Sequence, residues 1–355
     1  MDKSFTKLVI DEILSLREAM KAMNETAKKI LFVTDQKGAY IGSLSGGDIR
    51  RWILAGGSLK SRVSEIVRRD SLVDDGSSDF EEILDKARAQ KIKYIPILDS
   101  NKNIIDIFDG NVSSGAGHIK DVHDHLQNPV VIMAGGKGTR LAPLTKIIPK
   151  ALIPIGGKTI LEIIIEKFLP YHVKEFYLSV NHKSSMIESY FDDLKPDYSI
   201  KYIDEVKPLG TAGALYKLKN QMNKSIIITN CDIIIDADYA NILKHHQAHS
   251  NEITIITSLK HFNVPYGVCE LKNGGELKEI IEKPEYNLLV NTGMYIIEPS
   301  VLKYIPKEEL FHFTDLIDVV ISMGGRIGIY PIGEGAWVDT GEWDEYRSAI
   351  KMFGL

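Results

Sequence analysis

The stretch from 134 to 150 reads Ala134-Gly-Gly-Lys-Gly-Thr-Arg-Leu-Ala-Pro-Leu-Thr-Lys-Ile-Ile-Pro-Lys150, and it concentrates glycine and positive charge. It directly follows the apolar run 129–133, so it lies where a strand is expected to end. Glycine lets a backbone approach a bulky anion closely and aim amide groups at it, while lysine and arginine supply charge. The stretch is therefore predicted to bind a polyphosphate, with charge from Lys137, Arg140 and Lys150 and backbone contacts from Ala134, Gly135, Gly136, Gly138 and Thr139.

Two common glycine motifs do not fit this sequence. A dinucleotide fingerprint, G-x-G-x-x-G, needs a third glycine where Leu141 stands. A P-loop ending at 157–159 needs its first glycine where Leu152 stands. The segment 156–159 is instead predicted to be a turn into a helix, with Thr159 as N-cap and Glu162 completing a capping box.

Composition excludes several classes of protein. The 355 residues are 44% hydrophobic and 26% charged, which is enough for two or three globular cores. A net charge of -5 gives no basic surface for nucleic acid. The only two cysteines, Cys231 and Cys269, lack metal or disulfide spacing, and no run approaches the roughly 20 apolar residues of a membrane span. A cytoplasmic protein without nucleic-acid or membrane partners is expected.

The glycine-rich stretch resembles the sugar nucleotidyltransferases, whose motif is an apolar strand, then G-G-x-G-T-R-L-x-P-L-T and P-K. Residues 135–141, 143–145 and 149–150 match it throughout. The resemblance covers residues 128–355 and implies a catalytic domain with a Rossmann-like, mixed and mostly parallel α/β sheet. It also implies an enzyme that joins an NTP to a sugar 1-phosphate with the help of Mg²⁺.

The pattern of apolar runs independently predicts a layered α/β sheet. Several runs lack polar alternation, which is typical of strands buried on both faces. Ligands of such sheets bind at the carboxyl ends of strands, where the glycine-rich stretch is expected. The candidate strands are Glu175 to Val180, Ile226 to Asn230, Ile253 to Ser258, Met294 to Ile297 and Ile327 to Ile332.

Two carboxylates are candidate ligands for the metal. Asp232 ends an apolar strand, and a carboxylate there, near a phosphate loop, suits Mg²⁺; the alternative role is a cap or turn. Asp339 lies in Trp337-Val-Asp-Thr-Gly341, and its alternative role is a turn residue before the glycine. The resemblance implies that Asp232 and Asp339 together hold the catalytic ion.

The tripeptide Glu282-Lys283-Pro284 follows a strand-like run. A carboxylate beside a cation suits a phosphosugar, with Glu282 accepting from ring hydroxyls and Lys283 holding and aligning the 1-phosphate. Alone it is a trivial tripeptide. The resemblance gives it a place between the metal Asp and an N-x-G turn, here Asn291-Thr292-Gly293, whose Asn291 and Gly293 also touch the sugar.

The segment 209–215, Leu-Gly-Thr-Ala-Gly-Ala-Leu, contains small residues that allow close approach of a flat base or a sugar. The alternative is an ordinary helix start. Gly210 and Ala212 are assigned to the nucleotide, and Glu205 and Gly213 to the sugar. Glu205 with L-G-T-A-G looks closest to the guanylyl branch of the family, which favours GTP.

Residues 1–120 contain an internal repeat. Val33-Thr34-Asp35 aligns with Ile97-Leu98-Asp99, 64 residues further along, and each follows an amphipathic helical pattern. The repeat resembles a pair of CBS modules, which implies a smaller α/β regulatory domain that binds AMP or ATP at Gly42, Ser45 and Asp48. In the second copy Asp106, Asp109 and Val112 occupy the equivalent positions, so at most one site is expected. The alternative is a purely structural or dimer-forming pair, and a homodimer is expected.

Histidines offer no convincing metal site. The three in the expected linker, His118, His123 and His125, are interpreted as solvated, and His245, His246 and His249 as the polar side of a helix. Three classes of function remain. The first is a sugar-1-phosphate nucleotidyltransferase, the second a catalytically inactive, nucleotide-sensing regulatory subunit of such an enzyme, and the third a sensor or scaffold.

Overall fold

The structure is a computed structural model that describes residues 6–26, 28–76, 80–90, 92–109 and 125–352. It divides into two compact units, Met1–Val122 and His123–Leu355. Most of the expected linker, including His118 and His123, and the position of Val112 lie outside the described residues, whereas His125 lies within them and is exposed. None of the described helices has the length and apolar character needed to cross a membrane.

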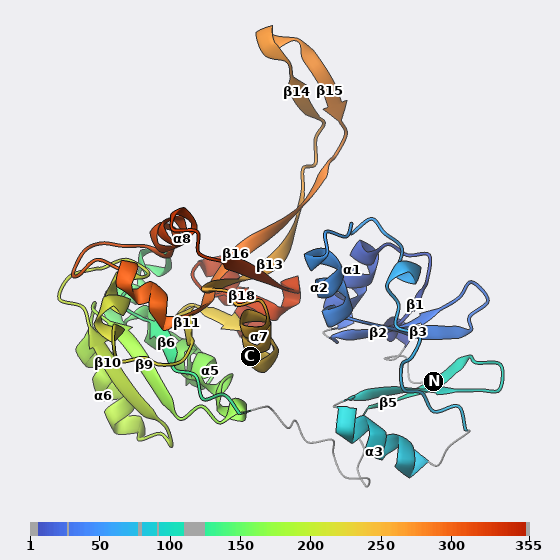
Figure 1. Cartoon of the computed structure of the whole chain (residues 1–355), viewed down its shortest axis with the longest axis horizontal. Helices are drawn as coiled ribbons and strands as arrows, with labels where there is room; N and C mark the ends of the chain where they lie inside the picture. The colour runs from blue at the N-terminus through green and yellow to red at the C-terminus, as the bar shows by residue number, and fades with distance from the viewer. Residues whose placement is uncertain (1–5, 27, 77–79, 91, 110–124, 353–355) are drawn as a thin grey trace. The chain divides into compact units, whose positions relative to one another are not determined.

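The second unit is built on a seven-stranded sheet with the order β10-β9-β6-β11-β16-β13-β17 (Figure 1). The strands β10, β9, β6 and β11 run parallel to one another, β16 runs antiparallel to both of its neighbours, and β13 is parallel to β17. The expected mixed, mostly parallel sheet is therefore confirmed. The strands are β6 Val130–Met133, β9 Glu175–Val180, β10 Ser199–Asp204, β11 Ile226–Asn230, β13 Ile253–Asn263, β16 Glu285–Ile297 and β17 Ile327–Ile332.

Both faces of this sheet are buried, which explains the unbroken apolar runs. In β6, Val130 and Ile132 enter the core on one face, and Val131 and Met133 enter the core on the other. One face is covered by α5 Ile160–Glu166, α6 Ser184–Leu194, α7 Tyr239–Ala248 and α9 Trp343–Met352. The other is covered by α8 Phe313–Ser322 and the 3₁₀ helices η6 Gly213–Leu218 and η8 Pro299–Tyr304.

The helix α5 begins as the sequence predicts. The Thr159 hydroxyl accepts from the Glu162 amide at 3.2 Å, and the Glu162 carboxylate accepts from the Thr159 amide at 2.7 Å. This reciprocal cap satisfies two amides at the helix N-terminus that would otherwise have no partner. The structural interpretation of the Gly-Lys-Thr tripeptide is therefore confirmed.

Two strands are much longer than their apolar runs. The expected strands 253–258 and 294–297 are the inner parts of β13 and β16, which pair as far as Asn263 and Glu285. Beyond them, β14 Val268–Leu271 and β15 Leu277–Ile281 form a hairpin. We name residues 262–289 the arm, which extends away from the sheet of its own unit (Figure 1). The strand-like run before Glu282 is confirmed as β15, whereas the outer parts of β13 and β16 have exposed residues and were not predicted as strands.

The first unit repeats a helix followed by a two-stranded hairpin. The helix α1 Leu16–Thr26 precedes β2 Ile30–Thr34 and β3 Tyr40–Ser45, and α3 Phe80–Gln90 precedes β4 Tyr94–Leu98 and β5 Ile104–Asp109. The strand β1 Val9–Asp11 pairs with β2. Asp35 and Asp99 make the same turn, each accepting from the amides two and four residues later. The internal repeat is thus present in local structure, whereas the CBS assignment stays a prediction.

The interpretation of His246 as part of the polar side of a helix is wrong. It is fully buried under α7, with Nδ1 2.8 Å from the Thr254 hydroxyl and Nε2 3.0 Å from a Glu298 carboxylate oxygen. The polar partners lie on strand β13 and after β16, so the helical pattern alone could not reveal them. Burial lowers the pKa of His246, which favours the neutral ring in the folded protein.

We expect acidification to destabilise the second unit through His246. The unfolded chain protonates this ring near pH 6.5, whereas the folded form resists protonation, so the stabilisation is complete above about pH 6.5 and is lost as the pH falls through the folded pKa. Urea unfolding between pH 7.5 and 5.5 should show a smaller decline in the His246→Gln variant. His249→Gln, at an exposed position just after the same helix, is the control, and equal slopes in all three proteins would contradict the assignment.

Candidate active site

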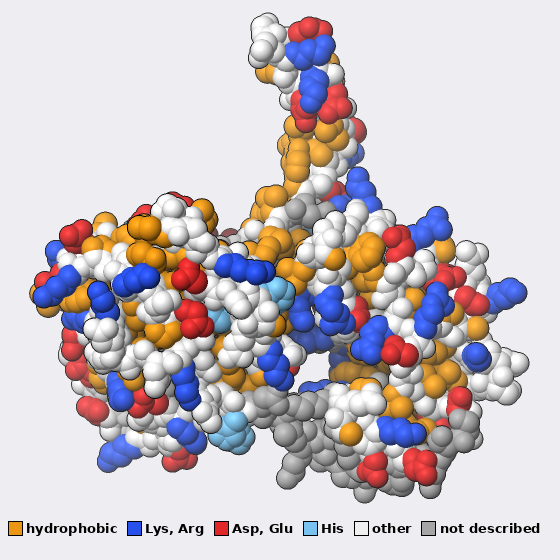
Figure 2. Space-filling model, in the orientation of Figure 1, with side chains coloured by type: hydrophobic (Ala, Val, Ile, Leu, Met, Phe, Trp, Pro, Cys, Tyr) orange, Lys and Arg blue, Asp and Glu red, His pale blue; other side chains and the backbone are white. Residues whose placement is uncertain are grey.

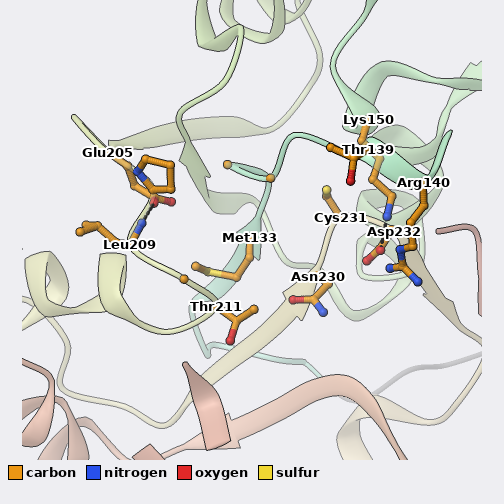
Figure 3. Close-up of a pocket in the computed structure, with 15 residues that line it drawn as sticks. Met133, Thr139, Arg140, Lys150, Glu205, Leu209, Thr211, Asn230, Cys231 and Asp232 are labelled. Carbon is orange, nitrogen blue, oxygen red and sulfur yellow. Dashed lines mark hydrogen bonds and ion pairs between the residues drawn. The ribbon is translucent and has the colours of Figure 1, made fainter. Parts of the chain in front are cut away.

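A cavity opens where the carboxyl ends of β6 and β11 lie side by side. Met133 pairs with Asn230, and the Cys231 amide donates to the Met133 carbonyl at 3.1 Å. The chain leaving β6 is the glycine-rich loop, and the chain leaving β11 leads to Asp232. The cavity has a volume of about 380 Å³, a size typical of small-ligand sites (Figure 3). It is lined by Met133, Gly135, Gly136, Gly138, Thr139, Arg140, Lys150, Glu205, Pro208, Leu209, Gly210, Thr211, Asn230, Cys231 and Asp232.

Two glycines of the loop are required by packing. Gly138 has φ +62°, and a Cβ on it would lie 2.8 Å from Thr145 Cγ2 and 3.0 Å from Lys150 Cβ. A Cβ on Gly135 would lie 2.7 Å from a Glu205 carboxylate oxygen. No heavy atom stands within 4 Å of the corresponding point on Gly136. The loop therefore holds Lys150 and Glu205 close while Gly136 leaves room at the cavity wall.

Lys150 and Asp232 form an ion pair at one end of the cavity (Figure 3). Lys150 is only 8% exposed, so its ammonium group has been moved out of water into contact with a carboxylate. Lys150 comes from the short 3₁₀ helix after the glycine-rich loop, and Asp232 from the end of β11. The structure thus brings together two residues that the sequence predicted from separate motifs.

A two-stranded ribbon places Asp339 beside Asp232. The strand β12 Ile233–Ile235 pairs antiparallel with β18 Trp337–Asp339, and the Thr340 amide donates to the Asp232 carbonyl at 2.7 Å. A carboxylate oxygen of each aspartate lies within about 3 Å of the point where a Cβ on Gly341 would stand. The two carboxylates are therefore no more than about 6 Å apart.

The electrostatics of this pair favour a bound cation. Burial raises the pKa of Asp339, and the neighbouring Asp232 carboxylate raises it further. Arg140 lies on the same side and is paired with Glu342 at 2.8 Å, which raises the pKa of the guanidinium. Two carboxylates within about 6 Å of each other could together hold a divalent ion. Among the described residues, no cluster of three or more His, Cys, Asp or Glu completes a metal site.

Glu205 lies at the opposite end of the cavity from Lys150 and Asp232 (Figure 3). Its carboxylate accepts from the Ser179 hydroxyl at 2.5 Å and from the Leu209 amide at 2.9 Å. These bonds tie the segment after Glu205 to the end of β9. In this structure Glu205 therefore positions the cavity wall, and its predicted contact with a sugar would come in addition to that role.

The small-residue segment divides between cavity and core. Gly210 and Thr211 line the cavity, and Gly210 has φ +82°. The amides of Ala212 and Gly213 donate to the Phe311 carbonyl at 3.1 and 3.0 Å. Both residues are buried, and neither belongs to the cavity wall. The chain from 309 to 313 covers Ala212 and Gly213, so in this structure neither residue faces the cavity where the sequence predicted that it would contact a ligand.

The N-x-G turn packs against Asn230, which lines the cavity. Gly293 has φ +85°, and a Cβ on it would stand 2.5 Å from the Asn230 amide nitrogen. The Asn291 side chain accepts from the Gly293 amide and donates to the Tyr295 hydroxyl. Sequence analysis missed Asn230, although its place at the end of a buried strand, two residues before Asp232, was a usable signal.

Cys231 is a second cavity residue without a predicted role. Burial raises the pKa of its thiol to about 12, so it remains protonated at neutral pH. It lies in the cavity wall between Asn230 and Asp232 (Figure 3). A buried neutral thiol behaves as a small apolar side chain, and no nucleophilic role follows from it.

Glu282 and Lys283 are not brought to the cavity of their own chain. Both are exposed on the arm, just after β15. Lys283 is 11 residues before Met294 along the chain, which in extended backbone corresponds to roughly 35 Å. The β13–β16 ladder keeps this backbone extended as far as Glu285. The predicted convergence of Lys283 with Asp232 and Asp339 is thus absent within one chain.

The predicted regulatory residues have structural roles in the first unit. Ser45 caps α2 Gly46–Leu54 in a reciprocal box with Asp48, and the Asp48 carboxylate is also paired with Arg51. A Cβ on Gly42 would stand 2.2 Å from the Arg68 carbonyl oxygen. These contacts account for the residue types at positions 42, 45 and 48 without requiring a bound nucleotide.

The fold carries charged residues at the carboxyl ends of the parallel strands β6 and β11. This arrangement is typical of α/β proteins that bind phosphorylated ligands at the carboxyl ends of a mostly parallel sheet. Within that class, residues 129–353 match the profile described as nucleotidyl transferase. This chain belongs to the nucleotidyl transferase family.

Several curated proteins resemble the same part of the chain. A mannose-1-phosphate guanylyltransferase catalytic subunit beta of Dictyostelium discoideum is 30% identical over 232 residues, 63% of this chain and 64% of that protein. A UTP–glucose-1-phosphate uridylyltransferase of Synechocystis is 32% identical over 242 residues, 62% of each chain. The bifunctional protein GlmU of Methanococcus maripaludis is 34% identical over 226 residues, 60% of this chain and 52% of that protein. The match therefore spans between half and two thirds of these relatives.

A solved structure shares the fold of the second unit. The crystal structure of HddC from Yersinia pseudotuberculosis aligns with a TM-score of 0.51 and 26% identity, covering 64% of this chain and 99% of that one. The curated relatives include sugar-1-phosphate nucleotidyltransferases whose names specify different bases.

Proposed function

We propose that this protein transfers a nucleotidyl group from an NTP to a hexose or hexosamine 1-phosphate, forming an NDP-sugar and pyrophosphate. The observation that carries the proposal is the convergence of Lys150, Asp232, Asp339 and Arg140 at the carboxyl ends of β6 and β11. A dead or purely structural domain has no physical need for a buried lysine beside two close carboxylates.

The reaction needs no general base. A sugar 1-phosphate is ionised at neutral pH, and one of its oxygens attacks the α-phosphorus of the NTP. A bond forms between that oxygen and the α-phosphorus, and the bond from the α-phosphorus to the oxygen bridging to the β-phosphorus breaks. Pyrophosphate leaves with the electron pair. Catalysis then depends on positioning and on neutralising charge.

Each charged residue of the cavity has a place in this scheme. The amides of the glycine-rich loop hold the phosphates, and Lys150 faces the transferred group. Arg140, more exposed and close to both aspartates, stabilises the departing pyrophosphate. Asp232 and Asp339 fit a bound Mg²⁺, which would supply positive charge to the reacting phosphates when present. Asn291 and Gly293 would contact the sugar, and the support for this is the packing of Gly293 against Asn230, which lines the cavity.

GTP is our first choice of nucleotide. The support is the L-G-T-A-G segment with Glu205, together with a guanylyltransferase among the relatives. We place the base at the cavity end formed by Glu205, Leu209 and Thr211, opposite the cationic end (Figure 3), so Glu205, which the sequence assigned to the sugar, would lie on the base side. Main-chain amides and carbonyls there are the groups that distinguish one base from another.

A substrate matrix tests the proposal. We expect pyrophosphate release only when an NTP and a hexose or hexosamine 1-phosphate are both present with Mg²⁺, with GTP giving the highest kcat/KM. The assay pairs each NTP with each sugar phosphate, and product mass identifies the NDP-sugar. Nucleotide binding without pyrophosphate release from any pair would instead favour the inactive regulatory subunit.

Regulation by an adenine nucleotide at Gly42, Ser45 and Asp48 is a separate part of the proposal. It rests on the CBS resemblance alone, and the reciprocal cap and the Arg51 pair require a ligand to compete with existing contacts. The same matrix repeated with AMP or ATP tests it. Unchanged kinetics and no binding of either nucleotide to the full chain would leave these residues with structural roles.

A further inference from the structure

The arm lacks the support that holds the rest of the sheet. Next to β13, β17 ends its pairing at Ser258, and next to β16, β11 ends its pairing at Met294. Beyond these points β13 and β16 pair only with each other, up to Asn263 and Glu285. An isolated two-stranded ribbon is marginally stable in water. The arm would therefore be stabilised by packing against another surface.

The arm carries an unusual amount of exposed apolar surface. Tyr266 is 74% exposed, Leu271 68% and Ile280 58%, whereas no residue of the arm belongs to a described core cluster. Cross-strand pairing puts Cys269 opposite Ile280 and Leu271 opposite Leu277, so these side chains share one face of the tip. Figure 2 shows hydrophobic side chains along the arm. Exposed apolar patches of this kind mark interaction sites.

The cavity, in turn, is short of positive charge. Its lining residues carry two cations, Arg140 and Lys150, and each is already paired with a carboxylate of the same chain. A nucleoside triphosphate and a sugar phosphate bring several negative charges together, so a cation in addition to Arg140, Lys150 and a bound Mg²⁺ would strengthen their binding. Lys283 is exposed, and Glu282 and Lys283 lie where the arm leaves β15.

From these observations we propose that two copies of this chain exchange arms, and that each arm places Glu282 and Lys283 at the cavity of the other copy. This inference rests on the proposed function, because it assigns the sugar phosphate as the group that Lys283 holds. A continuous ladder from Thr257 and Asn291 to Asn263 and Glu285 prevents the arm from folding back without breaking its pairing. Reciprocal exchange lets both copies cover their arms with one two-fold contact.

The arm is long enough to form an interface with a second copy of the chain. The segment from Phe262 to Leu289 has 28 residues, and a standard interface uses about 20–30 residues on each side. A second copy also has a cavity with the glycine-rich loop and the two aspartates, to which Lys283 would add a cation for the sugar phosphate. A partner of another kind would not offer this cavity. The exchanged arm thus completes the site while it buries its apolar face.

Complementation between two inactive variants tests the exchange. Lys283→Ala removes the cation from the arm and leaves the cavity intact, and Asp232→Asn does the reverse. We expect each variant alone to release little pyrophosphate, and a 1:1 mixture after subunit exchange to recover about one quarter of wild-type activity, because half of randomly formed dimers carry one complete site of two. A mixture with no more activity than its components would overturn the proposal.

Controls separate this inference from the function itself. Lys278→Ala, on the same arm and paired with Glu270, should keep full activity. Full activity of Lys283→Ala would also overturn the arm exchange while leaving the nucleotidyl transfer in place. Failure of the wild-type protein with every substrate pair would instead reject the proposed function. Light scattering should show a dimer that Leu271→Ser with Ile280→Ser converts to monomer, and a wild-type monomer at all concentrations would refute the exchange.

Discussion

Asp232→Asn is expected to lower kcat by about 10²–10³-fold while leaving the fold intact. The substitution keeps the shape of the side chain and removes its charge. Lys150 then loses its counter-ion, and the pair of acidic oxygens that Asp232 forms with Asp339 is broken. Initial rates of pyrophosphate release at saturating substrates measure the effect, and circular dichroism checks the fold.

Asp236→Asn is the matched control for this substitution. Asp236 is four residues further along the chain and exposed, with a long contact of 3.3 Å to Lys167. Its effect on kcat should be less than about twofold, because exposed ion pairs contribute little. A near-normal rate for Asp232→Asn would remove the metal and charge assignment at this site.

Lys150→Met is expected to lower kcat/KM by about 10²-fold and also to destabilise the second unit by about 1–3 kcal/mol. Methionine fills most of the volume of the buried aliphatic stem but leaves Asp232 without its partner. The phosphates lose the cation that is held closest to the glycine-rich loop. Steady-state kinetics and urea unfolding, performed on the same preparation, separate the two effects.

Lys146→Met provides the comparison, since Lys146 lies four residues earlier in the same segment and is exposed. It should leave both kcat/KM and the free energy of unfolding unchanged within about 0.5 kcal/mol. If Lys150→Met and Lys146→Met behaved alike, Lys150 would have no special role in holding phosphate.

Much of the candidate site was predictable because its parts are local. The glycine-rich stretch and Lys150 lie within 17 residues, and Asp232 follows directly on an apolar strand. Parallel strands present their carboxyl ends at one edge, so β6 and β11 were expected to bring these parts together. The capping box at Thr159 was likewise readable from residues three positions apart.

The errors have a common physical origin. His246 is buried because strand β13 and Glu298 supply partners for its ring, and a helical pattern contains no information about such partners. Ala212 and Gly213 are covered by the distant segment 309–313. In each case a contact between residues far apart in sequence decided whether a side chain faces ligand, solvent or core.

Short-range sequence was sufficient for the phosphate loop, the buried strands and the separate acidic and basic candidates, since these depend on backbone freedom and on the period of apolar residues. No pattern in the residues themselves joined Asp232 to Asp339 across 107 positions; the family resemblance implied that pairing, and the β12–β18 ribbon supplies its physical basis. Tertiary structure alone placed Lys283 on the arm, away from the cavity of its own chain. Strand pairing is a long-range choice of hydrogen-bond partners, and a linear pattern does not specify it.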